Sequence, residues 1–485
     1  MVTDPKPMKF ELRGLDGRFT NELQTIAQIF YPNESFESFG QNIRGEVAPD
    51  EVNISCVREG DMLRLCVRQG ADIRAEALCE AAKMPLKLAL YGALKAFTGR
   101  KPAWGSLTGI RPGKLALDSL RRGLTQPEVL RLLTETYDAD EAKARLALAV
   151  ALAEAPFVAA DDPGYSLYVG IPFCPSKCLY CSFTSYPVGK HSGLTGTYLD
   201  CLEKELEFLA RHTHAKAAPA SVYIGGGTPS ALSAGEIDRL LGMIAARFDT
   251  AGAAEYSFEA GRADTITRDK LDVLREYGVT RVCVNPQSLH DTTLAHIGRC
   301  HTAADFARAF GMVRAAGFRT INSDIILGLG SETARDVAAT LDYLAELAPE
   351  NITIHTLALK RGSRLAEGGF CPADAAQARN IEEMLELSAS RMERARLAPY
   401  YMYRQKNSPG SFENVGYSQP GHESIYNIQI MAEKQTILAA GAGAVTKLYN
   451  PGTNELRRVF NVKSLDDYMS RIDEMIGRKA ELVYD

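Results

Sequence analysis

Three cysteines are spaced so that together they could hold an iron–sulfur cluster. Cys174, Cys178 and Cys181 form a C-x3-C-x2-C triplet, whereas the other cysteines are scattered along the chain. Three thiolates on one loop can hold three irons of a 4Fe–4S cluster and leave the fourth iron open to a small chelating molecule. Zinc is the alternative metal, but a structural zinc site usually has a fourth Cys or His close by, and the nearest candidate, His191, lies ten residues beyond Cys181. The triplet therefore favours an iron–sulfur cluster.

Glycine and polar residues further along the chain could complete a binding site. The segment Gly225-Gly226-Gly227-Thr228-Pro229 could let the backbone approach a ligand closely, because glycine has no side chain to obstruct it. Arg299 could pair with a carboxylate. Each residue taken alone could be a helix cap or a solvated loop end, but together they predict one polar site. The other candidate members are Glu259, Gln287 and Asp324.

The elements that must position these residues are short strands alternating with helices. Six β-branched runs are each followed by an amphipathic stretch long enough for a helix, with no antiparallel hairpin signal between them. This pattern predicts an α/β fold with a parallel sheet covered by helices, built from six βα units whose functional groups collect where the strands end. The six runs cover residues 166–171, 221–224, 255–259, 280–284, 320–327 and 351–356.

The regions on either side of the six units have different patterns. In the first part of the chain, leucine and valine alternate with arginine around Leu65 as in a half-buried strand, and Ala/Leu-rich helical stretches follow. Near residue 398 the strand–helix alternation stops, and a tail rich in tyrosine and glycine begins. We expect an N-terminal α+β accessory domain at 1–162, a barrel at 163–397 and a C-terminal region at 398–485 that closes one face of the barrel.

Composition and charge exclude several classes of protein. With 46% hydrophobic and 24% charged residues the chain is typical of soluble globular proteins, and its net charge of −5 provides no general attraction for nucleic acid or anionic lipid. The longest apolar runs, 146–153 and 437–445, are far shorter than the roughly 20 residues of a membrane span. The amino terminus lacks the apolar run of a secretory signal, and dilute cysteines suit a reducing compartment. We expect a cytoplasmic protein without a membrane span or a nucleic-acid partner.

The triplet and the segments after it resemble the radical S-adenosylmethionine (SAM) superfamily, in which the open iron binds the amino and carboxylate groups of the methionine moiety. From residue 165 to about 482 the chain is similar to the oxygen-independent coproporphyrinogen III dehydrogenase (oxidase) family, and residues 107–112 and 400–407 are most similar to its HemZ subgroup. The resemblance implies a partial (β/α)6 barrel with an N-terminal α+β domain and a C-terminal lid. It also implies a 4Fe–4S cluster and SAM as cofactors.

The resemblance assigns roles to individual residues. The three cysteines of the triplet would bind the cluster, and Tyr168, which precedes them, matches a tyrosine at the SAM and substrate site and would act in catalysis. The positions that would contact SAM are Tyr168, Tyr180, Gly226, Gly227, Thr228, Glu259, Gln287, Arg299 and Asp324.

The activity that the resemblance implies is oxidative decarboxylation in heme biosynthesis. A 5'-deoxyadenosyl radical derived from SAM would remove hydrogen from the β-carbon of a propionate, after which carbon dioxide leaves and a vinyl group remains. Two such events would convert coproporphyrinogen III to protoporphyrinogen IX. The implied partners are the tetrapyrrole and a low-potential electron donor such as flavodoxin or ferredoxin.

Two alternatives remain open from the sequence. The chain has Gly170 and Phe183 where the well-defined dehydrogenases have a histidine and a further cysteine, so a radical SAM enzyme with another substrate is one alternative. The other is a heme carrier, because a sister group of heme chaperones has a His-Asn-x-x-Tyr-Trp motif where residues 426–431 begin with Tyr426. Tyr426 argues against a histidine-ligated heme, although a tyrosinate could bind iron.

Other aromatic and basic residues have two interpretations each. Tyr400, Tyr401 and Tyr403 with Arg404 and Lys406 could line a porphyrin pocket, or they could be ordinary packing. The loop around Trp104 with Arg111 and Lys114 is interpreted as a domain joint, the alternative being a site for substrate carboxylates. His355, at the end of the sixth run, is either a substrate or proton-transfer residue or a core histidine.

Overall fold

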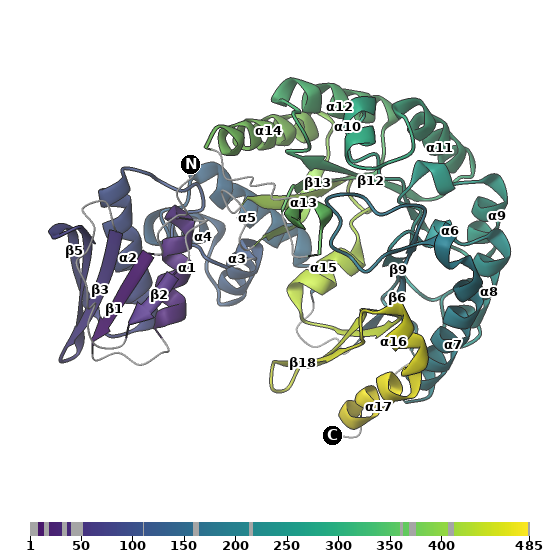
Figure 1. The fold of residues 1–485 in the computed structure, drawn as a ribbon, viewed down its shortest axis with the longest axis horizontal. Coiled ribbons are helices and arrows are strands. Elements are labelled where there is room, and N and C mark those ends of the chain that lie inside the picture. The colour runs from purple at the N-terminus through teal and green to yellow at the C-terminus, as the bar shows by residue number, and fades with distance from the viewer. Residues whose placement is uncertain are drawn as a thin grey trace. The chain divides into compact units, whose positions relative to one another are not determined.

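A computed structural model shows the fold of the chain (Figure 1). It divides into two compact units, here called the N-terminal unit (1–149, 372–378 and 403–413) and the barrel unit (150–371, 379–402 and 414–485). The functional division at 1–162, 163–397 and 398–485 stays a prediction. The residues that the structure describes are 8–13, 19–31, 36–39, 52–109, 111–158, 164–212, 217–358, 362–367, 375–405 and 412–483.

The N-terminal unit is built on a five-stranded sheet in the order β2-β1-β3-β4-β5. β1 pairs in parallel with β2 and β3, and the remaining pairs are antiparallel. Leu63, Leu65 and Val67 of β4 are fully buried and pack against helices α1 and α2, so the predicted alternation marks a real strand. The strands are β1 (Met8–Arg13), β2 (Phe36–Phe39), β3 (Val52–Glu59), β4 (Met62–Gln69) and β5 (Asp72–Glu80). The helices that begin in this unit are α1 (Thr20–Phe30), α2 (Lys83–Thr98), α3 (Pro112–Arg121), α4 (Gln126–Arg131) and α5 (Glu141–Glu154), with a π-turn at Leu132–Thr136.

The barrel unit contains the six predicted parallel strands, each paired with the next one along the chain. This arrangement confirms the α/β fold class. Most residues of these strands are buried, as expected for a parallel sheet that is covered on both faces. The six strands are β6 (Tyr165–Ile171), β9 (Ser221–Gly226), β10 (Glu255–Glu259), β11 (Arg281–Cys283), β12 (Thr320–Leu327) and β13 (Asn351–Thr356).

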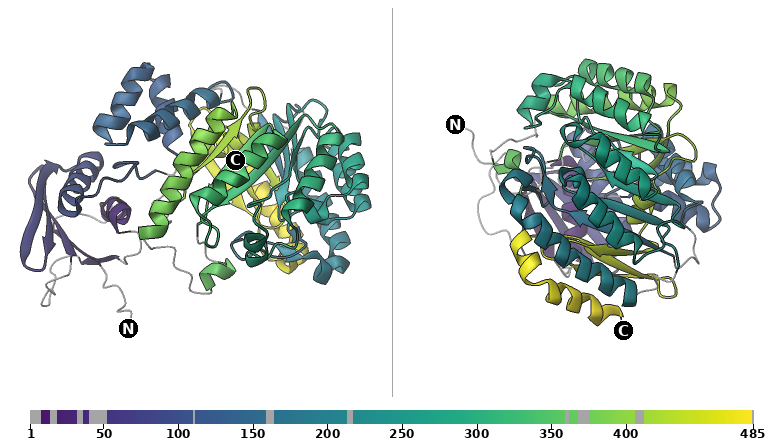
Figure 2. Two further views of the ribbon diagram at one scale, coloured as in Figure 1. Left: turned by 90° about the horizontal axis from the view of Figure 1, so that it is seen from above. Right: turned by 90° about the vertical axis from the view of Figure 1, so that its right-hand side faces the viewer.

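Helices follow the strands and form a layer on the outer face of the sheet (Figures 1 and 2). Several begin at a capping box, as at Ser233 of α8 and Thr302 of α11, where a side chain satisfies the first free backbone N–H groups. The main helices are α7 (Thr195–His212), α8 (Ala234–Ala245), α9 (Arg268–Glu276), α11 (Ala303–Ala315), α12 (Ala334–Leu347) and α14 (Ala375–Arg394). Shorter helices are α6 (Val188–His191), α10 (Asp291–His296) and α13 (Arg364–Glu367), with 3-10 turns at Ser192–Leu194, Pro229–Ala231 and Ala263–Thr265.

The C-terminal region, which we expected as a lid, extends the sheet at both of its edges. β15 pairs with β13, and β16 pairs in parallel with β6, so the edges of the six-stranded core have partners for their backbone groups. The added strands are β14 (Ala398–Arg404), β15 (Glu413–Ser418), β16 (Thr436–Ala440), β17 (Val445–Asn450) and β18 (Glu455–Phe460). The helices of this region are α15 (Ile425–Ala432), α16 (Leu465–Ser470) and α17 (Ile472–Val483), of which α16 and α17 pack on α7 (Figure 2).

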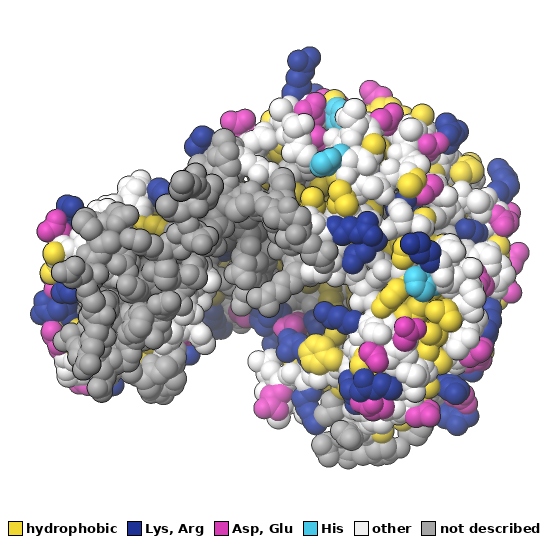
Figure 3. All heavy atoms as spheres, in the orientation of Figure 1, with side chains coloured by type: hydrophobic (Ala, Val, Ile, Leu, Met, Phe, Trp, Pro, Cys, Tyr) yellow, Lys and Arg dark blue, Asp and Glu magenta, His cyan; other side chains and the backbone are white. Residues whose placement is uncertain are grey.

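The surface of the described chain is mixed in charge. On the face drawn in Figure 3, basic and acidic side chains lie next to one another, in keeping with the small net charge of −5. Within the described ranges, no helix is both long enough and apolar enough to cross a bilayer.

Candidate active site

The cysteine loop follows β6 and is held in place by backbone hydrogen bonds. It begins in the short strand β7 (Phe173–Cys174), which pairs with β8 (Tyr186–Pro187) where the loop ends. Midway, the backbone N–H of Leu179 donates to the carbonyl of Ile297 at 3.0 Å. Because both ends and the middle are anchored, the fold fixes the positions from which Cys174, Cys178 and Cys181 present their thiols.

The three thiols lie close enough to interact electrostatically with one another, in a loop that is largely buried. Cys174 and Cys178 are buried, and Cys181 is half-buried. Burial raises the pKa of Cys174 to about 11, and the other two thiols add to this effect. Iron ligation requires thiolates, so charge compensation from nearby cations or from a bound metal matters at this loop.

The glycine-rich segment after β9 packs directly against the cysteine strand. The N–H groups of Gly227 and Thr228 donate to the carbonyls of Ile171 and Phe173 at 2.8 and 2.7 Å. A Cβ on Gly227 would lie 2.6 Å from the Phe173 oxygen and 3.0 Å from the Cys174 sulfur. The close approach that the glycines permit here is therefore to the backbone around Cys174, and it places the Thr228 hydroxyl 3.4 Å from the Cys174 sulfur.

Arg299 reaches the cysteine loop from the segment after α10. Its Nη1 donates to the carbonyls of Asn285 and Gly261 at 2.5 and 3.3 Å, and its Nη2 donates to the Tyr180 hydroxyl at 3.3 Å. The side chain is 8% exposed, and its Nε is buried without a hydrogen-bond partner. Protein groups thus orient the guanidinium and leave its Nε without an acceptor, while the pairing with a ligand carboxylate stays a prediction.

Arg262 is a second cation at the cysteine loop, and it is not among the site residues predicted from the sequence. It forms a two-point ion pair with Asp264 at 2.8 and 2.9 Å, and its Nη1 lies 3.1 Å from the Ser176 hydroxyl and 3.9 Å from the Cys178 sulfur. Burial would raise the pKa of Asp264, but His301 and Arg262 hold it well below its usual range. Arg262 therefore places a positive charge beside the cysteine loop, and this charge opposes the rise in the pKa of Cys174 that burial causes. The Arg-x-Asp spacing soon after Glu259 was the available signal in the sequence.

Gln287 has a strained backbone and an unsatisfied side chain. Its φ is +67°, a left-handed value that is uncommon for residues other than glycine. Its backbone is fixed by hydrogen bonds with Asp324 and Ile326 at 2.9 Å each. The side chain is 8% exposed, and its Oε1 is buried without a donor. Strain and a missing hydrogen bond each cost about 1–3 kcal/mol, so this residue has the properties of a ligand-binding position.

Asp324 lies on β12 beside two polar neighbours. Asn322 donates to its Oδ1 at 2.8 Å, and the Nε2 of His355 lies 3.7 Å from its Oδ2. Burial alone would raise the pKa of Asp324, but His355 and Asn322 hold it below its usual range. His355 is thus paired with a predicted site residue rather than isolated in an apolar core.

Glu259 is held by a tyrosine that the sequence analysis did not single out. The Tyr223 hydroxyl donates to Glu259 Oε1 at 2.5 Å. Burial, with a contribution from Asp324, raises the pKa of Glu259 to about 7, while the Tyr223 hydrogen bond opposes this shift. Glu259 therefore changes charge near neutral pH.

Three half-buried tyrosines stack beside Glu259. The ring centroids of Tyr223 and Tyr426 are 4.3 Å apart, and those of Tyr168 and Tyr426 are 5.8 Å apart, with interplanar angles of 21° and 18°. Tyr426 comes from α15, so the C-terminal region contributes to the barrel lining. Burial raises the pKa of Tyr426 well above its usual value, which disfavours the tyrosinate needed to bind heme iron.

The predicted tyrosine and arginine cluster near residue 400 is largely packing. Tyr400 and Tyr401 are buried with ring centroids 5.0 Å apart. Arg404 is 5% exposed, lies over the Trp104 ring at 5.4 Å and donates to the carbonyl of Leu107 at 2.5 Å. A guanidinium held in this way is not presented to a propionate. Lys406, the other predicted cation, lies outside the described residues.

Trp104 is an internal anchor of the N-terminal unit. It is 3% exposed, and its indole N–H donates to Glu413 Oε2 at 2.8 Å. The Lys143 ammonium also pairs with Glu413. All three residues belong to the N-terminal unit, so these contacts are internal packing, and the predicted domain joint and its substrate-carboxylate alternative stay untested.

The cysteine loop suits the iron–sulfur cluster that the sequence predicts. The donor set is three neighbouring thiols with Arg262 beside one of them, and the buried Gln287 oxygen and Arg299 Nε provide unsatisfied polar atoms for a SAM molecule. In the described part of the chain, no group of three His, Cys, Asp or Glu side chains is arranged to hold a single metal ion. The residues therefore fit a cluster with an open iron and a polar chelating ligand.

We expect replacement of Arg299 with alanine to weaken SAM binding about ten- to a hundredfold. The reason is the loss of a charge-assisted contact, which is worth about 1.5–3 kcal/mol. Calorimetric titration of SAM into the reconstituted variant measures this effect, with iron content checked first. Binding at the wild-type affinity would remove Arg299 from the SAM site.

Comparison with known proteins gives three findings. The pattern of the Radical SAM superfamily matches residues 168–344. The oxygen-independent coproporphyrinogen-III oxidase-like protein HemZ of Bacillus subtilis is 33% identical over 98% of this chain and 97% of that protein, and the heme chaperone HemW of the same organism is 29% identical over 64% of this chain and 76% of its own. The structure of coproporphyrinogen III oxidase (HemN) from Escherichia coli, a radical SAM enzyme, superposes with a TM-score of 0.53 at 24% identity, covering 69% of this chain and 73% of that one.

Proposed function

This chain belongs to the HemZ family of oxygen-independent coproporphyrinogen-III oxidase-like proteins in the radical SAM superfamily, and from that premise we propose that it decarboxylates two propionates of coproporphyrinogen III to vinyl groups in heme biosynthesis. The observation that carries the proposal is that Arg299, a buried cation with an unsatisfied Nε, contacts the loop that holds the three cysteines. Arg299 contacts Tyr180 within that loop, and Gln287 and Asp324 are joined by a backbone hydrogen bond at the neighbouring strand ends.

The cofactors would supply the radical, and the chain would supply position and charge. When bound, a reduced 4Fe–4S cluster and SAM would supply a radical that takes one hydrogen atom from a propionate β-carbon; loss of carbon dioxide would then leave the vinyl group and pass one electron per propionate to an external electron acceptor. Cys174, Cys178 and Cys181 hold the cluster. The SAM site would be formed by Tyr168, Tyr180, Gly226, Gly227, Thr228, Glu259, Gln287, Arg299 and Asp324, and Tyr168 would also act in catalysis.

Conserving the radical requires a site that excludes water. The stacked rings of Tyr168, Tyr223 and Tyr426 provide an apolar wall beside Glu259. We include in the proposal a low-potential donor of the flavodoxin or ferredoxin type and a reducing cytoplasmic setting, which suits the thiols of the cysteine loop.

Anaerobic product analysis tests the proposal directly. The reconstituted protein is incubated with SAM, dithionite and coproporphyrinogen III, with Cys178→Ala as the inactive control. We expect 5'-deoxyadenosine to form in step with carbon dioxide and with harderoporphyrinogen or protoporphyrinogen. Stoichiometric heme binding without any decarboxylated product would instead identify a heme carrier, and radical formation with coproporphyrinogen unchanged would indicate another substrate.

We expect SAM affinity to increase as the pH rises through about 7. The pKa of Glu259 is raised to about 7. Above this pH the side chain is a carboxylate, which accepts hydrogen bonds from the hydroxyl and amino groups of SAM better than the protonated acid does. Tyr223→Phe removes the hydrogen bond that favours the carboxylate, so the midpoint of this dependence should move to higher pH. Glu259→Gln should remove the dependence. Calorimetric SAM titrations across neutral pH measure all three. A pH profile in Tyr223→Phe equal to that of the wild type would contradict the coupling.

A further inference from the structure

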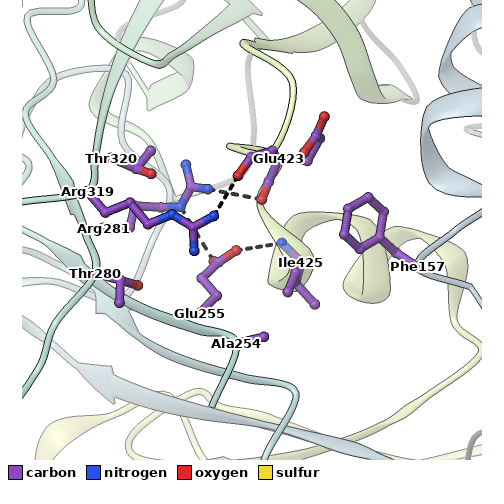
Figure 4. Close-up of a pocket in the computed structure, with 10 residues that line it drawn as sticks. Phe157, Ala254, Glu255, Thr280, Arg281, Arg319, Thr320, Glu423 and Ile425 are labelled. Carbon is purple, nitrogen blue, oxygen red and sulfur yellow. Dashed lines mark hydrogen bonds and ion pairs between the residues drawn. The ribbon is translucent and has the colours of Figure 1, made fainter. Parts of the chain in front are cut away.

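A second candidate binding site lies at the opposite ends of the strands from the cysteine loop. Residues at the beginnings of β10, β11 and β12 line a cavity of about 280 Å³ (Figure 4). Since β10 runs from Glu255 to Glu259 at about 3.3 Å per residue, the cavity lies on the order of 13 Å from the Glu259 end. None of the residues assigned to the cluster or to SAM lines it.

Two arginines, Arg281 and Arg319, provide positive charge in the cavity lining. Arg281 is 4% exposed at the start of β11, and the exposed Arg319 directly precedes β12. Arg281 Nη2 donates to the carbonyls of His422 and Glu423 at 2.8 and 3.0 Å, and Arg319 Nη2 donates to the carbonyl of Gly421 at 3.1 Å. Both guanidiniums are therefore oriented by the segment that closes the cavity.

Arg281 has more donors than the protein satisfies. Its Nε and Nη1 are both buried without a hydrogen-bond partner. Glu255 Oε1 lies 3.6 Å from Nε, which is close enough for an ion pair but beyond hydrogen-bond distance. A buried N–H donor without an acceptor destabilises the folded protein. A ligand group with several acceptor oxygens would satisfy the two free donors of Arg281.

Glu255 cannot turn to supply those acceptors. Its Oε1 accepts hydrogen bonds from the Ser257 and Ser424 hydroxyls at 2.7 and 2.9 Å, and its Oε2 accepts from the Ile425 N–H at 2.6 Å. The second acidic residue of the lining, Glu423, meets Arg281 through its backbone carbonyl. The carboxylate of Glu255 is thus held by other donors, while Arg281 Nη1 remains unsatisfied.

We propose that this cavity binds a small organic anion through a phosphate or carboxylate group held by Arg281 and Arg319. Arg is suited to such groups because its planar donors match their oxygens. The closing segment, 421–425, leads directly into α15, which carries Tyr426 into the barrel. An anion that ties this segment to β11 and β12 would also restrain α15.

Calorimetric titration of the full-length protein with inorganic phosphate and, separately, with succinate tests the site. Ionic strength is kept constant with potassium chloride, because screening changes nonspecific binding. We expect saturable binding of at least one probe. A preference for phosphate identifies a phosphate-bearing ligand, and a preference for succinate identifies a carboxylate-bearing one. Arg319→Ala and Arg281→Lys should each weaken the preferred probe about tenfold or more.

Two further variants keep the test decisive. Ala254→Leu narrows the cavity while leaving both arginines in place, and it should also weaken binding. Arg308→Ala removes an equal charge from the exposed face of α11 and should leave binding unchanged. The proposal is overturned if neither probe binds saturably, if Arg308→Ala weakens binding as much as Arg319→Ala, or if the three cavity variants bind as well as the wild type.

Discussion

Replacement of Cys178 with alanine is expected to abolish assembly of the 4Fe–4S cluster. Cys178 is buried in the middle of the loop, where the Leu179 N–H is tied to Ile297 and Arg262 lies 3.9 Å from its sulfur. Cys174 and Cys181 are the other cysteines of this loop, so the variant keeps two of the three proposed ligands. Two thiolates leave two irons without protein ligands, and iron and sulfide content after anaerobic reconstitution should fall to background.

The matched control is Cys201→Ala. Cys201 is also buried, but it lies on α7 with its sulfur 3.6 Å from the carbonyl of Met469, away from the loop. This variant loses a thiol of the same size and burial and should keep the full iron and sulfide content. A normal cluster in Cys178→Ala would contradict the assignment of the three ligands. Stoichiometric zinc in place of iron in the purified wild type would favour the zinc alternative.

The parallel core was predictable because its signals are local. Each strand of the barrel coincides with a short predicted run, such as 320–327, which contains β-branched residues and is followed by a stretch with the pattern of a helix. The cysteine triplet is also a local pattern. Only boundaries moved, as for β11, which covers Arg281–Cys283 within the predicted run 280–284, because the following residues leave the ladder to form the Gln287 turn.

Several residues of the candidate site were not predictable because distant segments bring them together. Tyr223 has the sequence pattern of any strand tyrosine, and only the fold places its hydroxyl 2.5 Å from Glu259. Tyr426 lies more than two hundred residues from Tyr223, yet α15 stacks the two rings. Arg262 contacts Cys178 through a similar long-range approach. Such contacts depend on tertiary packing, about which residue type and spacing carry little information.

At Arg404 the structure favours ordinary packing, which is one of the two interpretations that the sequence left open. A porphyrin pocket was one reading of the basic and aromatic residues near 400, but Arg404 is buried over Trp104, and burial lowers its pKa to about 10. Pairing with a distant strand likewise determines the structure of the C-terminal tail. The strand pattern of 436–440 is too short to identify by itself, but β6 provides the edge on which it forms β16.

Replacement of Lys479 with methionine is expected to destabilise the barrel unit by about 3–5 kcal/mol, because it leaves the buried carboxylate of Glu205 without its cation. Glu205 is fully buried on α7, and Lys479 on α17 is 2% exposed. The Glu205 carboxylate also accepts hydrogen bonds from Asn461, Tyr468 and the Gly441 N–H at 2.7, 2.6 and 2.8 Å. These neutral donors stabilise the charge but do not cancel it.

This network connects the C-terminal helices to the strand that leads into the cysteine loop. A Cβ on Gly441 would lie 2.4 Å from the Gly170 carbonyl oxygen in β6, and the Tyr198 hydroxyl donates to the same oxygen at 2.6 Å. Loss of the Lys479 contact should therefore loosen the anchoring of β16 beside β6 as well as that of α17. Urea unfolding followed by far-ultraviolet circular dichroism measures the change in stability.

The control and the double variant separate the ion pair from general damage to α7. Arg211→Ala removes the exposed partner of Glu207 on the same helix and should change stability by less than about 0.5 kcal/mol, since exposed pairs contribute little. Combining Lys479→Met with Glu205→Gln removes both charges and keeps a side-chain oxygen as an acceptor for the neutral donors, so the double variant should recover much of the loss, and the coupling energy of the cycle should be large. Equal losses in Lys479→Met and in the double variant would show that packing volume, rather than the unpaired carboxylate, sets the cost.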